Sequence, residues 1–313
     1  MNTNTTNTTQ PPQRIDIQKE AVCLSIKMGM LHTRRRIRTS QIVTDADPAM
    51  VHVAKDIFES EELQAISRHH GLIRTWLKMR CLPSPFRSGV YLIRLSLVSE
   101  VMDALNGFEQ AEKQLIETFL KFYDTIYNQR NNETSDLSSK LGTLYNAEDY
   151  PNPRAVAQAF TFETQLWEIG TPGALRSVDR ALYEREAAKM QNVWESARVS
   201  ITQVLLTEFR DMTARMAERM VVGPDGKAKV FRETLVGNLQ DWLDVFDKRA
   251  ITDDATLLGQ VQKARALIAG IDGKTLRDSE SLKVEVAEGM QQITSTLDAA
   301  IIERPGRLIQ MED

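Results

Sequence analysis

A run of arginines is the part of this sequence whose residue types most plainly suggest a binding function. Arg34, Arg35, Arg36 and Arg38 fall within five residues, and their like charges repel one another unless an anion meets them. Guanidinium groups form paired hydrogen bonds with phosphates and carboxylates, so the run predicts an anion-binding or partner-binding segment. No aromatic residue is interleaved with the arginines, so base stacking is not indicated. A nucleic-acid backbone, an acidic protein face and a plain solvated loop remain open as explanations.

Three methionines spaced four residues apart form a second candidate site. Met212, Met216 and Met220 lie near the end of a long helix that the apolar pattern predicts over residues 178–220. Such a stripe is usually core packing, and the alternative is an adaptable groove that docks a partner helix. The companions of this helix are short, so part of its length has no evident cover. That favours a coiled-coil-like pairing or a partner surface.

Residues that could perform catalysis or bind a metal are few and poorly placed. His69 and His70 are adjacent, so on a helix they point about 100° apart and cannot easily share one ion. Cys23 alternates with apolar strand residues and is typical of a small buried hydrophobe. The string Gly223–Lys227 is too short for a phosphate-binding loop and follows a helix instead of a strand. We therefore predict no catalytic residue, no metal site and no cofactor, and hence a protein that is not an enzyme.

Composition narrows the class of protein further. The chain has 313 residues, 42% of them hydrophobic, which is enough for a sizeable core. No apolar stretch approaches a membrane span, the first residues do not form a secretory signal, and two cysteines are too few for a disulfide framework, so we expect a cytoplasmic protein. The net charge of −4 divides unevenly: residues 14–94 carry a balance of +6 and residues 95–313 a balance of −10. A basic first third suggests an anionic partner or contact with the acidic remainder.

The hydrophobic periodicity predicts a mainly α protein with a minor β part. Alternating residues predict strands over 20–28 and 160–169, which would pair as a small sheet. Long helices are expected over 93–128 and 178–220, packed as an elongated antiparallel hairpin, and shorter ones over 60–79, 230–246, 254–268 and 279–301. Asp47-Pro48 predicts one more helix start. The implied regions are a disordered arm (1–13), a basic α+β region (14–94), a hairpin with an inserted strand (95–222), a helical bundle (223–303) and a tail (304–313).

Several segments together resemble one family of uncharacterised bacteriophage and prophage proteins. The segments are Leu24–Arg36, Leu82–Gly89, Leu144–Pro151, Phe160–Phe162, Met216–Arg219 and the residues Phe231, Arg232, Leu235, Asn238 and Leu239. In this order they span most of the chain, from about residue 20 to 300. Members of the family are often encoded beside a MoxR-type AAA+ ATPase and a von Willebrand A-domain protein. The resemblance implies a phage accessory factor that serves that pair as an adaptor, substrate or third component, in the host cytoplasm.

Two functional hypotheses follow. The first is a non-enzymatic interaction protein that works with the AAA+ ATPase, the von Willebrand A-domain protein or both through its long helices, with a homo-oligomer also open. The second is a nucleic-acid-binding phage protein that uses Arg34–Arg38. The resemblance supplies no catalytic residues for either hypothesis.

Overall fold

A computed structural model describes residues 17–38, 41–42, 45–47, 49–132, 134–220 and 232–302. It divides the chain into two compact units built from interleaved segments. Unit 1 comprises Met1–Ser25, Lys78–Val98 and Leu166–Asp313, and unit 2 comprises Ile26–Leu77 and Ser99–Gln165. The consecutive regions expected from the sequence therefore do not coincide with the compact units, and neither does the division into a basic and an acidic part.

The sheet confirms the strand pairing expected from the sequence. Four strands lie in the order β4 (Leu82–Pro83), β5 (Val90–Arg94), β1 (Ala21–Gly29) and β6 (Thr161–Trp167). In unit 1, β1 runs antiparallel to β5, with Ala21 opposite Arg94 and Ser25 opposite Val90. In unit 2, the Gly29 amide donates to Thr161 Oγ1 at 3.1 Å. A Cβ at position 29 would meet that oxygen at 2.5 Å, so the close approach of the two strands requires glycine.

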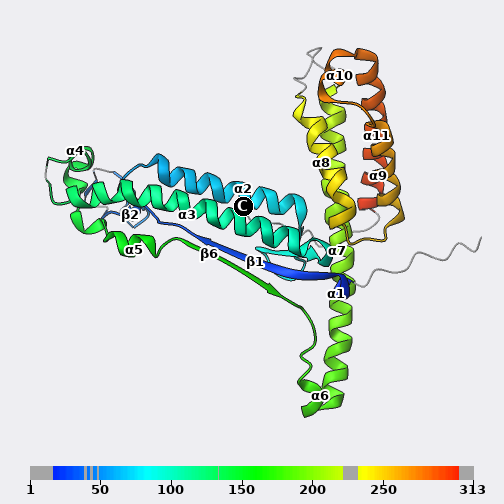
Figure 1. Ribbon diagram of the computed structural model, residues 1–313, viewed down its shortest axis with the longest axis horizontal. Coiled ribbons are helices and arrows are strands. Elements are labelled where there is room, and N and C mark those ends of the chain that lie inside the picture. The colour runs from blue at the N-terminus through cyan, green and yellow to red at the C-terminus, as the bar shows by residue number, and fades with distance from the viewer. Residues whose placement is uncertain are drawn as a thin grey trace, which may run out of the picture. The chain divides into compact units, whose positions relative to one another are not determined.

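A helical bundle in unit 1 surrounds the C-terminal part of α7 (Arg180–Met220), as Figure 1 shows. Its other members are α8 (Thr234–Arg249), α9 (Ala255–Leu267), α10 (Gly273–Asp278) and α11 (Glu280–Ile302), and α6 (Leu175–Val178) precedes α7. α11 packs against both α7 and α9, and α8 contacts α7, α9 and α10. The core includes a stack of Phe209 on Trp242, whose rings lie 4.9 Å apart and nearly parallel. Asp254 begins α9 by accepting a hydrogen bond from the Leu257 amide at 2.8 Å.

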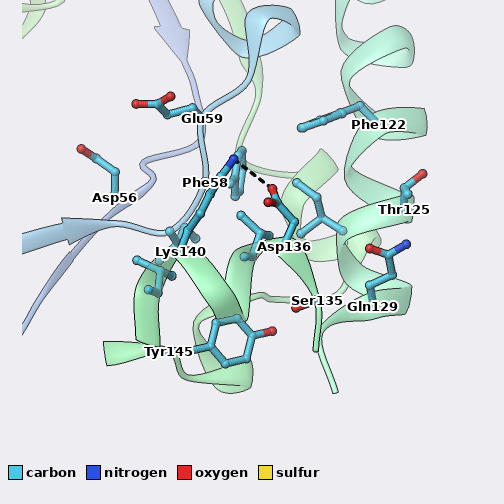
Figure 2. A pocket seen from close by; sticks show the side chains of 14 residues that line it. Asp56, Phe58, Glu59, Phe122, Thr125, Gln129, Ser135, Asp136, Lys140 and Tyr145 are labelled. Carbon is cyan, nitrogen blue, oxygen red and sulfur yellow. Dashed lines mark ion pairs between the residues drawn. The ribbon is translucent and has the colours of Figure 1, made fainter. Parts of the chain in front are cut away.

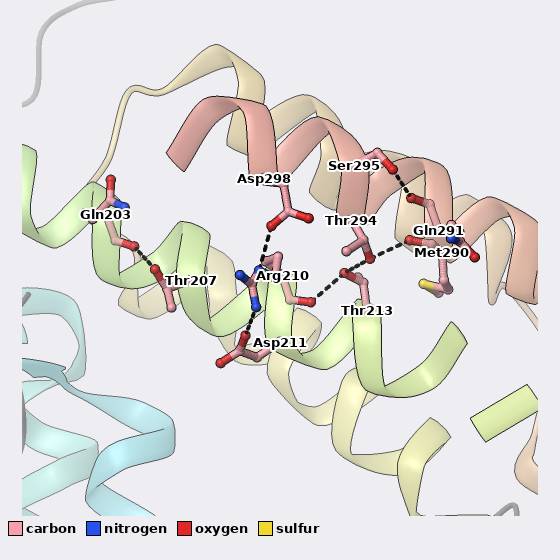
Figure 3. A network of polar contacts seen from close by, with 10 residues as sticks. All are labelled: Gln203, Thr207, Arg210, Asp211, Thr213, Met290, Gln291, Thr294, Ser295 and Asp298. Carbon is pink, nitrogen blue, oxygen red and sulfur yellow. Dashed lines mark hydrogen bonds and ion pairs between the residues drawn. The ribbon is translucent and has the colours of Figure 1, made fainter. Parts of the chain in front are cut away.

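Polar contacts fix the register of α7 against α11 (Figure 3). Arg210 Nε donates to Asp298 Oδ1 at 2.8 Å, and the hydroxyl oxygens of Thr213 and Thr294 lie 2.9 Å apart. The Thr294 hydroxyl also donates to the Met290 carbonyl, so its hydrogen-bonding capacity is satisfied inside the interface. These pairs form in one alignment of the two helices only, whereas the apolar contacts alone would tolerate a shift.

Unit 2 is built around α2 (Glu61–Arg80) and α3 (Val98–Gln129), with short elements around the far end of α3. The short elements are β2 (Arg34–Arg36), β3 (Ala54–Asp56), α4 (Asp136–Leu141), the 3-10 turns Gly142–Leu144 and Ala147–Asp149, and α5 (Pro153–Ala157). Ser60 begins α2 by accepting a hydrogen bond from the Leu63 amide. Phe58, Phe119 and Tyr123 form an aromatic cluster in the core. Tyr150 is buried beside it and donates its hydroxyl to the Ile57 carbonyl at 2.7 Å.

The mainly α fold with a small sheet is confirmed, but the pairing of the long helices differs from the expectation. α3 belongs to unit 2 and α7 to unit 1, and the helix that packs along α7 is α11. The residue spacing identified an apolar face on each helix, but it did not identify which other helix packs against that face. The first long helix also starts later than predicted, because the apolar run Val90–Ile93 forms β5, buried on both faces.

Two further sequence expectations have different outcomes. Asp47 does not begin a helix: its carboxylate accepts from the Ala49 amide within a turn, and the chain then continues to β3. The predicted arm 1–13, the Gly223–Lys227 string and the tail 304–313 lie outside the described residues. A short unpredicted helix, α10, follows Gly270, whose φ of +71° suits the end of α9.

Candidate functional site

The arginine run forms one strand of a two-stranded ribbon in unit 2. β2 pairs antiparallel with β3, with Arg34 opposite Asp56 and Arg36 opposite Ala54. Because side chains alternate along a strand, Arg34, Arg36 and Arg38 are exposed, and Arg35 between them is partly buried. Arg34 Nε lies 3.5 Å from Asp56 Oδ1, a pair exposed enough to contribute little stability. The ribbon therefore presents three of the four predicted arginines on one exposed face.

The exposed arginines differ in how far their charge is already matched. Arg36 donates to His52 Nδ1 at 2.5 Å, so its partner is a ring nitrogen and not a carboxylate. The guanidinium of Arg38 has no partner within the part of the chain that the structure describes, and its backbone amide donates to Gln41 Oε1. Anionic groups on a ligand could therefore reach this face without first breaking a strong ion pair.

The opposite side of the ribbon is tied to the core. Arg35 donates to the His32 carbonyl at 2.8 Å and lies close to Tyr123. Burial raises the pKa of Tyr123 to about 12, and the charge of Arg35 opposes that shift. Lys55 on β3 forms an ion pair with Asp149 at 2.5 Å, largely out of solvent. These contacts make Arg35 a structural residue, unlike the other three arginines.

A cleft of about 500 Å³ in unit 2 lies next to the ribbon (Figure 2). Its walls come from the segment after β3, from the end of α3, and from α4 with Tyr145. The floor is apolar, and Asp56, Glu59, Asp136 and Lys140 lie among its lining residues. Lys140 Nζ lies 2.9 Å from Asp136 Oδ2, and this hydrogen bond raises the pKa of Lys140. Within the cleft Asp136 and Lys140 pair with each other, whereas Asp56 pairs with Arg34 of the ribbon.

The histidines are separated, as the sequence indicated. His69 Nε2 lies 2.9 Å from the Phe108 carbonyl, whereas His70 Nε2 lies 2.9 Å from Glu112 Oε1. His70 and Glu112 are both buried, and sequence reasoning missed this pair. A signal was present, because Glu112 occupies a core position on the apolar stripe of α3, between Phe108 and Leu115. A buried carboxylate at such a position requires a partner.

The cysteines are buried in unit 1, which agrees with the interpretation of Cys23 as a small core residue. Burial raises the pKa of Cys81 to about 12, against the charges of Arg249 and Arg80, which lower it. Burial also raises the pKa of Cys23. Neither thiol is a nucleophile at neutral pH. Across the described residues, no three His, Cys, Asp or Glu side chains gather as they would around a metal ion.

The predicted methionine stripe belongs to the core of unit 1. Met216 and Met220 are buried, and Met212 is partly buried against the same core. The core interpretation therefore holds, and the docking alternative does not, because neighbouring helices already cover Met216 and Met220. The stripe was correctly placed on α7, but on the part of the helix that the bundle surrounds.

The uncovered part of α7 is its beginning. None of residues 180–193 is buried, whereas the twelve buried residues of the helix all lie between Trp194 and Met220. A groove of about 920 Å³ runs beside the uncovered part. Its α7 wall comprises Tyr183, Ala187, Met190, Gln191, Trp194, Glu195 and Arg198. The sequence predicted that part of this helix would lack cover, and Val193 in this part is 43% exposed.

Comparison with known proteins gives no identity to this chain. No family model matches it, and no curated protein or solved structure matches it. No described helix is both long enough and apolar enough to cross a membrane.

Proposed function

We propose that this protein is a non-enzymatic interaction factor that binds a protein partner through the first part of α7. One observation carries the proposal: the first four turns of α7, residues 180–193, contain no buried residue, and an open groove lies beside them. Isolated helical segments of this length are only marginally stable in water. A partner that covered the segment would bury its apolar residues and stabilise it.

The partner we propose is a MoxR-type AAA+ ATPase, acting with a von Willebrand A-domain protein. The sequence resemblance to phage proteins encoded beside that pair supports this choice. The protein would then present a surface for binding and leave the nucleotide chemistry to the ATPase.

Co-expression with a MoxR-type AAA+ ATPase and a von Willebrand A-domain protein tests the proposal. We expect the tagged full chain to retain the ATPase on an affinity column, with or without ATP. Substitution Met190→Arg, in the groove wall, should reduce retention at least tenfold, whereas Asn192→Arg on the outer side of the same helix should not. Failure of the ATPase to co-purify in either nucleotide state would contradict the proposed partner.

A second function, nucleic-acid binding, is favoured by the exposed arginine face of the ribbon. Residues two apart on a strand are separated by about 6.8 Å, so Arg34, Arg36 and Arg38 could each contact a different phosphate. Binding of this kind would be independent of base sequence and strongly dependent on salt.

Retention on single-stranded DNA and RNA columns at 50 mM salt tests this second function. The triple substitution of Arg34, Arg36 and Arg38 by Ala should abolish retention. Substitution of Arg74, Arg154 and Arg180 by Ala removes the same formal charge elsewhere and should leave retention largely intact. Absence of retention by the unmodified chain would eliminate the hypothesis.

A further inference from the structure

One histidine lies on the exposed face of the ribbon, among the arginines. The pairing of β2 with β3 continues by one residue, because the Ile37 amide donates to the Val53 carbonyl at 3.1 Å. The next pair in this register is Arg38 with His52, and both side chains are exposed. Side chains directly opposite each other in an antiparallel pair lie on the same face. His52 therefore shares a face with Arg36 and Arg38.

The contact between Arg36 and His52 requires one protonation state of the histidine. A guanidinium only donates, so the Nδ1 atom of His52, which lies 2.5 Å from Arg36 Nη2, accepts and carries no proton. In the protonated ring both nitrogens donate, and the two cations repel each other. Protonation of His52 therefore releases the Arg36 guanidinium and adds a positive charge to the exposed face.

The charges around His52 leave this face positive. The charged side chains of the exposed face and of the segment that joins the two strands are Arg34, Arg36, Arg38, Asp45, Asp47 and Asp56. Asp56 already pairs with Arg34, and Lys55 lies on the opposite side of β3, where it pairs with Asp149. Among the described residues, Asp45 and Asp47 form no ion pair with His52 or with the arginines. Two guanidinium groups next to His52 therefore have no carboxylate partner in the described part of the ribbon.

A phosphate group suits this arrangement of donors. Arg36 and protonated His52 cannot bind each other, but an oxyanion between them accepts a hydrogen bond from both. The two unbridged oxygens of a phosphodiester are acceptors of this kind. Residues two apart on a strand are separated by about 6.8 Å, so Arg34 and Arg38 extend the contact in both directions along a repeating backbone. Evenly repeated negative charge is typical of nucleic acids, and this favours them over the acidic face of a folded protein.

We propose that Arg36, Arg38 and protonated His52 bind one phosphate group, which is that of a nucleic-acid backbone under the second proposed function. The inference rests on that function, because it adds a binding residue and a proton linkage to the same face. Neutral His52 holds Arg36 and competes with the ligand, whereas a bound phosphate favours the protonated ring. Because linkage is reciprocal, protonation of His52 strengthens binding by the same factor.

Binding of a 20-nucleotide oligo(dT) to the full-length protein at pH 5.5 and pH 8 tests the proposal. Phosphodiesters and thymine keep their charge across this range, whereas an imidazole commonly changes its charge between pH 5 and 8. Fluorescence anisotropy with a pH-insensitive dye, at constant low salt, should show about tenfold tighter binding at pH 5.5. His52→Gln should reduce this ratio to less than twofold. His32→Gln removes the other exposed histidine and should leave the ratio largely unchanged.

Proton uptake separates a direct role of His52 from a structural one. Calorimetry at pH 7 in two buffers with different ionisation enthalpies should show that the protein takes up part of one proton when the oligonucleotide binds. His52→Gln should lose this uptake, and His32→Gln should retain it. Because the uptake is measured on the unmodified chain, the test remains decisive even if His52→Gln disturbs folding.

Inorganic pyrophosphate tests the phosphate site without a nucleic acid. It should shift the ring signals of His52 in an NMR spectrum, assigned with His52→Gln. If pyrophosphate shifts these signals but the oligonucleotide does not bind at either pH, the phosphate site stands and the second function fails. If neither ligand binds, both fail.

Other outcomes would overturn the inference and leave the second function standing. They are equal affinity for the oligonucleotide at the two pH values, an unchanged pH ratio in His52→Gln, and binding without proton uptake. Tighter binding of poly-glutamate than of the oligonucleotide would overturn both, because it would assign the face to an acidic protein.

Discussion

The two parts of α7 are held in helical form by different interactions. Residues 180–193 contain no buried residue. Asp179 accepts hydrogen bonds from the first amides, exposed ion pairs such as Arg180–Glu184 follow, and Met190 alone among these residues packs against the described core. Residues 194–220 rely on burial, with α8 and α11 packed around them. Local pairs contribute only a few tenths of a kcal/mol each, whereas a buried aromatic residue contributes several. The comparison teaches that the core of unit 1 does not require the full length of α7.

The largest difference between the two parts should appear when one side chain in each part is replaced by alanine. Phe209→Ala removes a fully buried ring from its stack on Trp242 and should lower the free energy of unfolding by about 3–5 kcal/mol. Val193→Ala, in the uncovered part, should lower it by less than about 0.5 kcal/mol. Urea denaturation followed by circular dichroism measures both values. Comparable losses would show that the first part of α7 is covered after all.

A buried arginine offers the next largest effect in the covered part. Arg249 is 1% exposed, donates to the Lys78 and Met79 carbonyls at 2.9 and 3.0 Å, and pairs with Glu208 of α7. Arg249→Ala removes this donor from the Lys78 and Met79 carbonyls and the ion pair from Glu208. We expect a loss of about 2–3 kcal/mol, since Glu208 still accepts from Trp242 Nε1 and can reach water. Arg180→Ala, which removes an exposed pair from the uncovered part, is the matched control. It should change stability by less than about 0.5 kcal/mol in the same denaturation assay.

The polar register between α7 and α11 can be tested with a double-mutant cycle. Thr213→Val leaves the Thr294 hydroxyl facing an apolar group and should cost about 1 kcal/mol, as should Thr294→Val. The double variant should cost less than the sum of the two, because both hydroxyls are then replaced. Strict additivity, measured by denaturation, would indicate that the two hydroxyls do not interact.

The smallest effect concerns a thiol in the buried part of unit 1, and it is absent at pH 7. The pKa of Cys81 is raised to about 12 in the folded chain, so an unfolded thiol, with a pKa near 8.5, loses its proton first as the pH rises. The contribution of the Cys81 thiol to the free energy of unfolding is therefore fully present below about pH 8.5 and declines from there towards pH 12. At pH 10 the unmodified chain should have lost on the order of 1 kcal/mol relative to Cys81→Ala, as denaturation at pH 7 and pH 10 would measure. Parallel stability curves for the two proteins would contradict the buried position of the thiol.

Much of the fold could be predicted from local patterns, because alternation and capping act over a few residues. The pairing of β1 with β6 and the extents of α2, α7 and α11 agree with the sequence expectations to within a few residues. The packing partners could not be predicted in the same way. Apolar faces on α3 and α7 look alike in sequence, and only the complete chain shows that α11 supplies the cover for α7. The strand Val90–Arg94 was not predicted for a related reason: a strand that is buried on both faces shows no alternation of apolar and polar residues.

A candidate site could be predicted from the sequence when its residues lie close together in the chain. The arginine run is contiguous, and alternation along a strand accounts for the exposure of Arg34 and Arg36. The groove beside α7 joins segments from three distant parts of the chain, so no spacing in the sequence could indicate it. For the methionines the spacing was informative, since it placed the stripe correctly on α7. The choice between core packing and a docking groove required the positions of the surrounding helices.

The interleaving of the two units has a consequence for synthesis on the ribosome. Every segment of unit 2 has been translated once residue 165 is made, whereas α7 is completed at residue 220 and α11, which covers it, about 80 residues later. At about 5–20 residues per second, that interval lasts on the order of ten seconds. Until then the apolar face of α7 and the β1–β5 edge belong to an unfinished unit. The nascent chain would spend this interval with the apolar face of α7 uncovered, so chaperone dependence during synthesis should exceed that during refolding of the full-length protein.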